Sequence, residues 1–73
     1  LRSEKGASAE AVIHYERAAQ LAPGDVSLYN TLGTVLGTLR RYEEAVVWFQ
    51  RALDLDPNYD KARVNLAQIR SLQ

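Results

Sequence analysis

Apolar residues recur at intervals of three and four along most of this chain, the spacing that places side chains on one face of an α-helix. No segment alternates apolar and polar residues with a period of two, so no strands are predicted. The chain is therefore predicted to be all-α. The clearest apolar stripe consists of Leu28, Leu32, Val35, Leu36 and Leu39.

Helix breakers and capping residues divide this pattern into four helices. Gly6 is expected to interrupt a short N-terminal helical tail, and Ser8 is expected to cap the first full helix. Asp25 is expected to cap the second helix, and Asn58 or Asp60 the fourth. The predicted helices span residues 8–21, 26–39, 42–55 and 60–72.

Two segments of the chain match each other at a spacing of 34 residues. Self-similarity at a fixed period indicates a repeat protein, and this period favours a helix–turn–helix unit. Function in such proteins usually lies on a surface rather than in a catalytic pocket. The matched pairs are Glu10 and Glu44, Ala11 and Ala45, Val12 and Val46, Tyr15 and Phe49, Arg17 and Arg51, Ala18 and Ala52, Leu21 and Leu55, and Pro23 and Pro57.

The second helical pair carries a more specific pattern. It reads Tyr29-x-x-Leu32-Gly33-x-x-Leu36, then Ala45-x-x-x-Phe49-x-x-Ala52, then Pro57. This pattern resembles the tetratricopeptide repeat. The resemblance implies a right-handed α-solenoid of antiparallel helix pairs. One full repeat would cover residues 26–59, after a partial repeat at 1–25 and before a partial repeat or capping helix at 60–73.

The resemblance also implies a concave groove, lined by the first helix of each pair, in which extended peptides bind. Polar side chains there can form hydrogen bonds with a peptide backbone without requiring one sequence. The alternative interpretation is a solvated helix face without a ligand. The residues expected in the groove by helical phase are Ser27, Asn30, Thr31, Thr34 and Thr38, followed by Lys61, Val64, Asn65 and Gln68.

Two finer forms of recognition occur in the family. Some members clamp a C-terminal carboxylate, and Lys61 matches one cation of that clamp, whereas Thr31 and Asn65 depart from it. Other members hold a peptide backbone with a ladder of asparagines, which Asn65 fits and Thr31 interrupts. Peptide binding in the groove is therefore the leading hypothesis, and the carboxylate clamp is a minor form of it.

An apolar strip is predicted on the opposite, convex face. Ile13 and Val47 occupy equivalent outward positions where a charged residue is more usual, and His14 and Trp48 lie beside them. Together these four residues would form a surface for a partner. Alternatively, Trp48 simply covers an edge of the core.

Unpaired outer helices favour a second hypothesis, in which the chain is a scaffolding element that self-associates through its ends and the convex strip. The turn at Arg40-Arg41 lacks the glycine that Gly6 supplies one repeat earlier. A continuous helix through this turn would exchange helices between chains. A third hypothesis is an accessory domain that presents substrates to a larger enzyme.

The composition of the chain mainly excludes certain classes of function. The 73 residues carry 9 basic and 9 acidic side chains, so there is no basic surface for nucleic acid or an anionic membrane. With no cysteine and only one histidine, His14, no metal or cofactor site is predicted. No nucleophile motif or phosphate loop is present in the sequence, so the chain is predicted not to be an enzyme. It begins at Leu1, which indicates a fragment or processed product.

Overall fold

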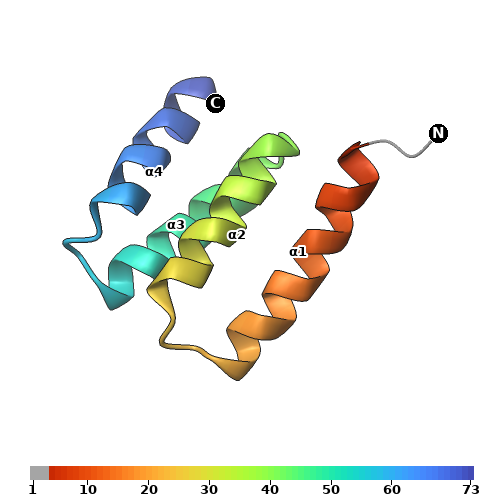
Figure 1. Ribbon diagram of the computed structural model, residues 1–73. Helices are drawn as coiled ribbons and strands as arrows, with labels where there is room; N and C mark the ends of the chain where they lie inside the picture. Colours follow the sequence, from red (N-terminus) through yellow and green to blue (C-terminus); the bar gives the residue numbers. More distant parts are fainter. Residues whose placement is uncertain (1–3) are drawn as a thin grey trace.

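The computed structural model describes residues 4–73, with the backbone alone for residues 4–9, and consists of helices joined by short turns (Figure 1). This confirms the all-α prediction. Three of the predicted helices agree with the observed ones to within one residue at each end, and the first differs at its start. The observed helices are α1 (Glu4–Leu21), α2 (Val26–Thr38), α3 (Tyr42–Leu55) and α4 (Asp60–Leu72).

The helices pack in sequence order. The most extensive packing is between α2 and α3, which form an antiparallel hairpin in the middle of the molecule (Figure 1). Helix α4 packs on α3 and also touches α2, while α1 packs on the other side of α2. One complete helical pair thus lies between two single helices, as the repeat interpretation predicts.

Helix α1 begins earlier than predicted, so two sequence interpretations are wrong. Gly6 does not interrupt the helix, and Ser8 lies inside it instead of capping it. A single glycine costs only about 1 kcal/mol in a helix interior. Its neighbours Glu4, Lys5 and Ala7 are good helix formers, so the helix continues through it. The predicted N-terminal tail otherwise lies outside the described residues.

The predicted N-cap of α2 is confirmed, because the Asp25 carboxylate accepts a hydrogen bond from the Leu28 backbone N–H at 3.3 Å. The predicted cap of α4 is wrong. Tyr59 holds the cap position without a side-chain hydrogen bond, and Asp60 is already helical. Asn58 belongs to the preceding turn, where its backbone N–H donates to the Asp56 carboxylate at 3.1 Å.

The turn between α2 and α3 reverses the chain, so the continuous helix considered for a helix-swapped form is not present. Arg40 adopts a left-handed conformation with φ of 64°. Its N–H donates to the Gly37 carbonyl at 3.0 Å, and the Arg41 N–H donates to the Leu36 carbonyl at 2.9 Å. These two bonds form the Schellman arrangement that commonly ends a helix. Arginine thus occupies a position where glycine is usual.

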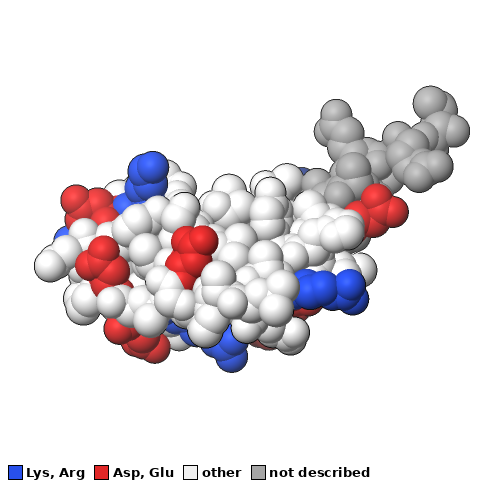
Figure 2. All heavy atoms as spheres, turned by 60° about the horizontal axis from the view of Figure 1, so that its bottom comes forward, with Lys and Arg blue, Asp and Glu red and all other residues white. Residues whose placement is uncertain are grey.

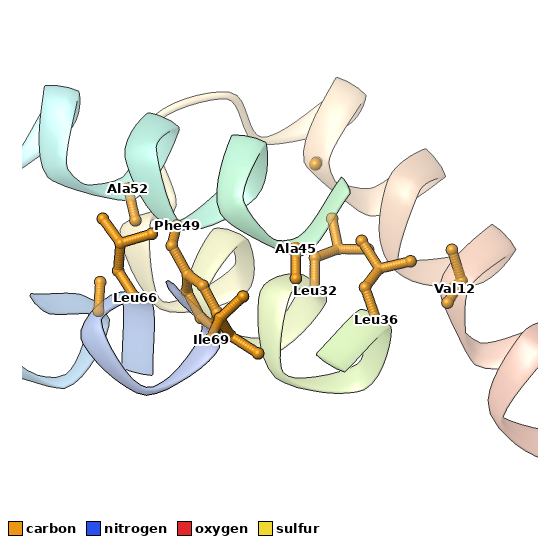
Figure 3. Packing of buried hydrophobic residues seen from close by; sticks show 10 residues of the cluster. Val12, Leu32, Leu36, Ala45, Phe49, Ala52, Leu66 and Ile69 are labelled. Carbon is orange, nitrogen blue, oxygen red and sulfur yellow. The ribbon is translucent and has the colours of Figure 1, made fainter. Parts of the chain in front are cut away.

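The core combines small and large apolar residues from all four helices. Phe49 is the largest fully buried side chain, and it lies close to Leu66 and Ile69 between α3 and α4 (Figure 3). On the other side, Val12 extends from α1 toward α2 (Figure 3). The buried apolar residues are Val12, Ala19, Leu32, Leu36, Ala45, Phe49, Ala52, Ala62, Leu66 and Ile69.

Equivalent residues of the two matched segments are buried to different extents. Ala45, Phe49 and Ala52 are fully buried because α2 covers them. Their counterparts Ala11, Tyr15 and Ala18 are only half-buried. Within the described part of the chain, no helix lies on that face of α1 as α2 lies on α3. Instead, α1 buries the adjacent stripe, which contains Val12 and Ala19, against α2.

Candidate functional site

One face of α2 carries a stripe of hydroxyl and amide side chains. The hydroxyls of Thr31, Thr34 and Thr38 each donate a hydrogen bond to the backbone carbonyl four residues earlier. The oxygen-to-oxygen distances are 3.0 Å to Ser27, 3.0 Å to Asn30 and 3.1 Å to Thr34, respectively. Since these bonds use the hydroxyl protons, each hydroxyl oxygen presents only lone pairs to a ligand.

A side-chain hydrogen bond joins this stripe to α4. The Nδ2 of Asn65 donates to the Oδ1 of Asn30 at 3.0 Å, and both side chains are half-buried. The pair keeps free N–H groups on both amides and a free carbonyl oxygen on Asn65. Helical phase in the sequence predicted both residues in the groove. The 34-residue repeat aligns Asn65 with Thr31, so the sequence did not predict the direct contact between Asn65 and Asn30.

Two hollows lie along the groove between α2 and α4, and Asn65 lines both. The hollow that contains Thr34 and Thr38, called the threonine hollow, has a volume of about 230 Å³. The hollow that contains Lys61, called the lysine hollow, has a volume of about 330 Å³. The threonine hollow is lined by Thr34, Gly37, Thr38, Phe49, Asn65, Gln68 and Ile69. The lysine hollow is lined by Asn30, Asp60, Lys61, Val64 and Asn65.

The structure therefore brings together most of the residues predicted for the groove. Ser27 and Thr31 are the exceptions, because they share the polar face of α2 but line neither hollow. Phe49 and Ile69 belong to the core and form the apolar floor of the threonine hollow. Gly37 allows this, since a Cβ there would lie 2.9 Å from the Cδ1 of Ile69.

The two hollows differ in charge. Asp60 and Lys61 line the lysine hollow, whereas no charged residue lines the threonine hollow. The Asp60 carboxylate also accepts a hydrogen bond from Arg63 at 3.2 Å, an exposed ion pair on the first turn of α4. Figure 2 shows acidic and basic side chains scattered over one face of the molecule, with no large area of one sign.

The residues predicted for the convex strip are divided between two helices. Ile13 and Val47 are exposed, at 58% and 45%, as predicted. Ile13 lies on α1 and Val47 on α3, and these two helices do not pack on each other in the part of the chain that the structure describes. His14 is exposed beside Ile13 on α1. The remaining residue, Trp48, packs against Tyr29 and Arg51.

Trp48 is half-buried and covers an edge of the core. Its ring centroid lies 5.5 Å from that of Tyr29, and the guanidinium carbon of Arg51 lies 4.7 Å from the Trp48 ring centroid. An arginine at this distance makes a cation–π interaction. Tyr29 lies on α2, and Trp48 and Arg51 lie on α3, so all three side chains belong to the same helical pair. The geometry therefore favours a packing role for Trp48.

None of the helices described is both long and apolar enough to cross a lipid bilayer. Over the same residues, no three histidine or acidic side chains are grouped so that they could hold a metal ion.

Comparison with known proteins adds family information. Residues 26–59 match the family model of the tetratricopeptide repeat. The peroxisomal targeting signal receptor of Saccharomyces cerevisiae is 42% identical over 53 residues, or 73% of this chain. The receptor of the same name in Candida albicans is 40% identical over 52 residues, or 71% of the chain. An inactive TPR repeat-containing thioredoxin of Arabidopsis thaliana, TTL3, is 34% identical over 65 residues, or 89%. The aligned part spans 9% of the length of each relative.

Proposed function

Because residues 26–59 are a tetratricopeptide repeat, a protein-interaction module, we propose that this chain binds a peptide or partner segment in the groove between α2 and α4. The observation that carries the proposal is the hydrogen-bonded pair of Asn30 and Asn65, which joins the two helices at 3.0 Å. An extended peptide presents backbone N–H and C=O groups, and the free amide groups of this pair match both. The proposal involves no catalysis and no cofactor.

The hollows support an extended occupant. Asn65 lines both, so a peptide backbone lying on the asparagine pair has a hollow on either side. Side chains of an extended chain alternate in direction. Successive residues of such a segment would therefore place one side chain in each hollow. Lys61 would lie beside only the side chain in the lysine hollow. The hydrogen bonds would hold the backbone, and the hollows would select the side chains.

The names of the relatives support a recognition segment of another protein as the occupant. Those from Saccharomyces and Candida are receptors for a peroxisomal targeting signal. The present chain spans 9% of their length, so we extend to it only the general activity of binding a segment of a partner protein.

Self-association through the outer helices is the rival function, and side chains on α4 disfavour it. One repeat along the chain, Arg63 corresponds to Tyr29, and Arg17 corresponds to the Arg51 that lies over Trp48. If α4 of a second copy covered α1 as α2 covers α3, it would place the guanidinium groups of Arg63 and Arg17 in the same interface. Two cations in one interface repel each other.

A binding experiment tests the groove assignment. Eight-residue positional-scanning peptide libraries, with free or amidated C-termini, are titrated by fluorescence polarisation against the wild-type chain and an Asn30→Ala/Asn65→Ala variant. We expect about tenfold weaker binding for the variant, since each lost hydrogen bond is worth about 0.5–1.5 kcal/mol. The matched control is Gln50→Ala, which removes an exposed amide from α3 outside the groove. Equal binding by the wild type and the double variant would refute the groove assignment.

A further inference from the structure

The threonine hollow presents an unbalanced set of hydrogen-bonding groups. We propose that it selects a peptide side chain that is uncharged and donates a hydrogen bond, namely a hydroxyl or a carboxamide. Thr34 and Thr38 would be the specificity-determining residues. This inference rests on the proposed function, because it assigns the side chain that one hollow of the peptide groove accepts.

The imbalance comes from the hydrogen bonds that the lining residues already make. The hydroxyl protons of Thr34 and Thr38 are donated to backbone carbonyls of α2, at 3.0 and 3.1 Å. One N–H of Asn65 is donated to Asn30 at 3.0 Å, and its carbonyl oxygen remains free. The rim of the hollow thus offers two hydroxyl oxygens and one amide oxygen as acceptors, against the one remaining N–H of Asn65 as a donor. A ligand must supply the donors, because an unpaired polar group removed from water costs about 1–3 kcal/mol.

No charged residue lines the threonine hollow, and this further restricts the ligand side chains that it can accept. Phe49 and Ile69 form the floor and are buried, at 1% and 8% exposure. A ligand carboxylate would meet the threonine oxygens with lone pairs against lone pairs. A lysine ammonium would find acceptors, but it would lose water above this apolar floor without an anionic partner. A purely apolar side chain would leave the acceptors unpaired.

The size of the hollow is consistent with a small or medium side chain. Its volume is about 230 Å³, whereas one water molecule occupies about 30 Å³ of liquid. Serine, threonine, asparagine and glutamine side chains all fit this space. The amide of Gln68 completes the rim and can turn either its donor or its acceptor toward such a group.

The test uses peptides that bind in the library experiment. Each position of such a peptide is changed in turn to Ser, Gln, Ala, Asp and Lys, and affinities are measured by fluorescence polarisation. We expect one position at which Ser or Gln binds about fivefold more tightly than Ala, Asp or Lys. This preference should fall below twofold in a Thr34→Val/Thr38→Val variant, because valine keeps the shape and removes the acceptors.

Thr31→Val is the matched control. Thr31 makes the same hydrogen bond to the helix backbone, at 3.0 Å, but does not line the hollow. The donor preference should therefore persist in this variant. The inference is overturned if no position prefers a donor, if Lys binds as tightly as Ser, or if the double variant keeps the preference. If no library peptide binds, the proposed function fails together with this inference, whereas binding without a donor preference refutes the inference alone.

Discussion

The ring of Phe49 packs directly on the backbone of α2 at Gly33. A Cβ at Gly33 would lie 2.5 Å from the Cε1 of Phe49 and 2.7 Å from its Cζ. The ring is buried between α2, α3 and α4, so moving it away from an added Cβ would disturb the packing around it. This contact gives the Leu-Gly step of the repeat signature a physical reason, because only glycine allows the two helices to approach so closely.

Gly33→Ala is therefore expected to destabilise the fold. Alanine has the higher helix propensity, by about 1 kcal/mol, but the added methyl group overpacks the core at a cost of about 1–3 kcal/mol. A steric contact this short favours the upper part of that range, so we expect a net loss of about 1–2 kcal/mol in urea unfolding. Gly24→Ala is the control, since a Cβ there meets no atom within 4 Å. A Gly33→Ala variant as stable as the wild type would contradict this account of the core.

Arg40→Gly is expected to stabilise the protein. Arg40 has φ of 64°, a conformation that costs a non-glycine residue about 1–2 kcal/mol. Glycine removes this strain but adds freedom to the unfolded chain, so the net gain should be about 0.5–1 kcal/mol. The midpoint of urea unfolding measures the effect. The adjacent variant Arg41→Gly should have the opposite sign, because Arg41 has φ of −92° and pairs with Glu44.

Tyr29→Phe is expected to weaken the connection between α1 and α2. The Tyr29 hydroxyl donates to the Pro23 carbonyl at 2.6 Å, which ties the start of α2 to the preceding turn. Losing this bond should cost about 0.5–1.5 kcal/mol in unfolding free energy. Tyr59→Phe serves as the control, since the Tyr59 hydroxyl has no hydrogen-bond partner among the described residues. Equal losses for the two variants would show that the Pro23 bond contributes nothing specific.

The ion pair between Arg41 and Glu44 predicts a small dependence of stability on pH. Two hydrogen bonds from the Arg41 guanidinium, at 2.8 and 2.7 Å, lower the pKa of Glu44 below its usual value. A lowered pKa in the folded state means that this contribution is present at neutral pH and is lost as the pH falls through that pKa. Because both side chains are about half exposed, solvent screens the pair and the contribution stays below about 1 kcal/mol.

Unfolding of Glu44→Gln by urea at neutral and acidic pH measures this contribution. The variant should be slightly less stable than the wild type at pH 7, and the difference should disappear in acid, where Glu44 is protonated. Glu43→Gln is the control, since Glu43 forms no ion pair with the side chains described, those of residues 10–73. A difference that persists in acid would show that the loss comes from something other than the ion pair.

The helices and the repeat register could be predicted because their signals are local. Asp25 caps α2 as predicted, and α3 begins and ends at the predicted residues. The family signature is likewise a spacing along one or two helices, read without knowledge of what covers them. The failures were also local: Gly6 is tolerated inside α1, and Asn58 and Asp60 do not cap α4.

The amino-acid sequence by itself determined the helical class, the 34-residue register and the polar character of the groove, because each depends on residue types at set intervals along the chain. Only the tertiary structure decided which of these residues meet. It paired Asn30 with Asn65, although the repeat register aligns Asn65 with Thr31, because α2 and α4 pack at an offset that no sequence interval encodes. It also left Tyr15 half-exposed while burying Phe49, since burial depends on whether another helix is present to cover the residue.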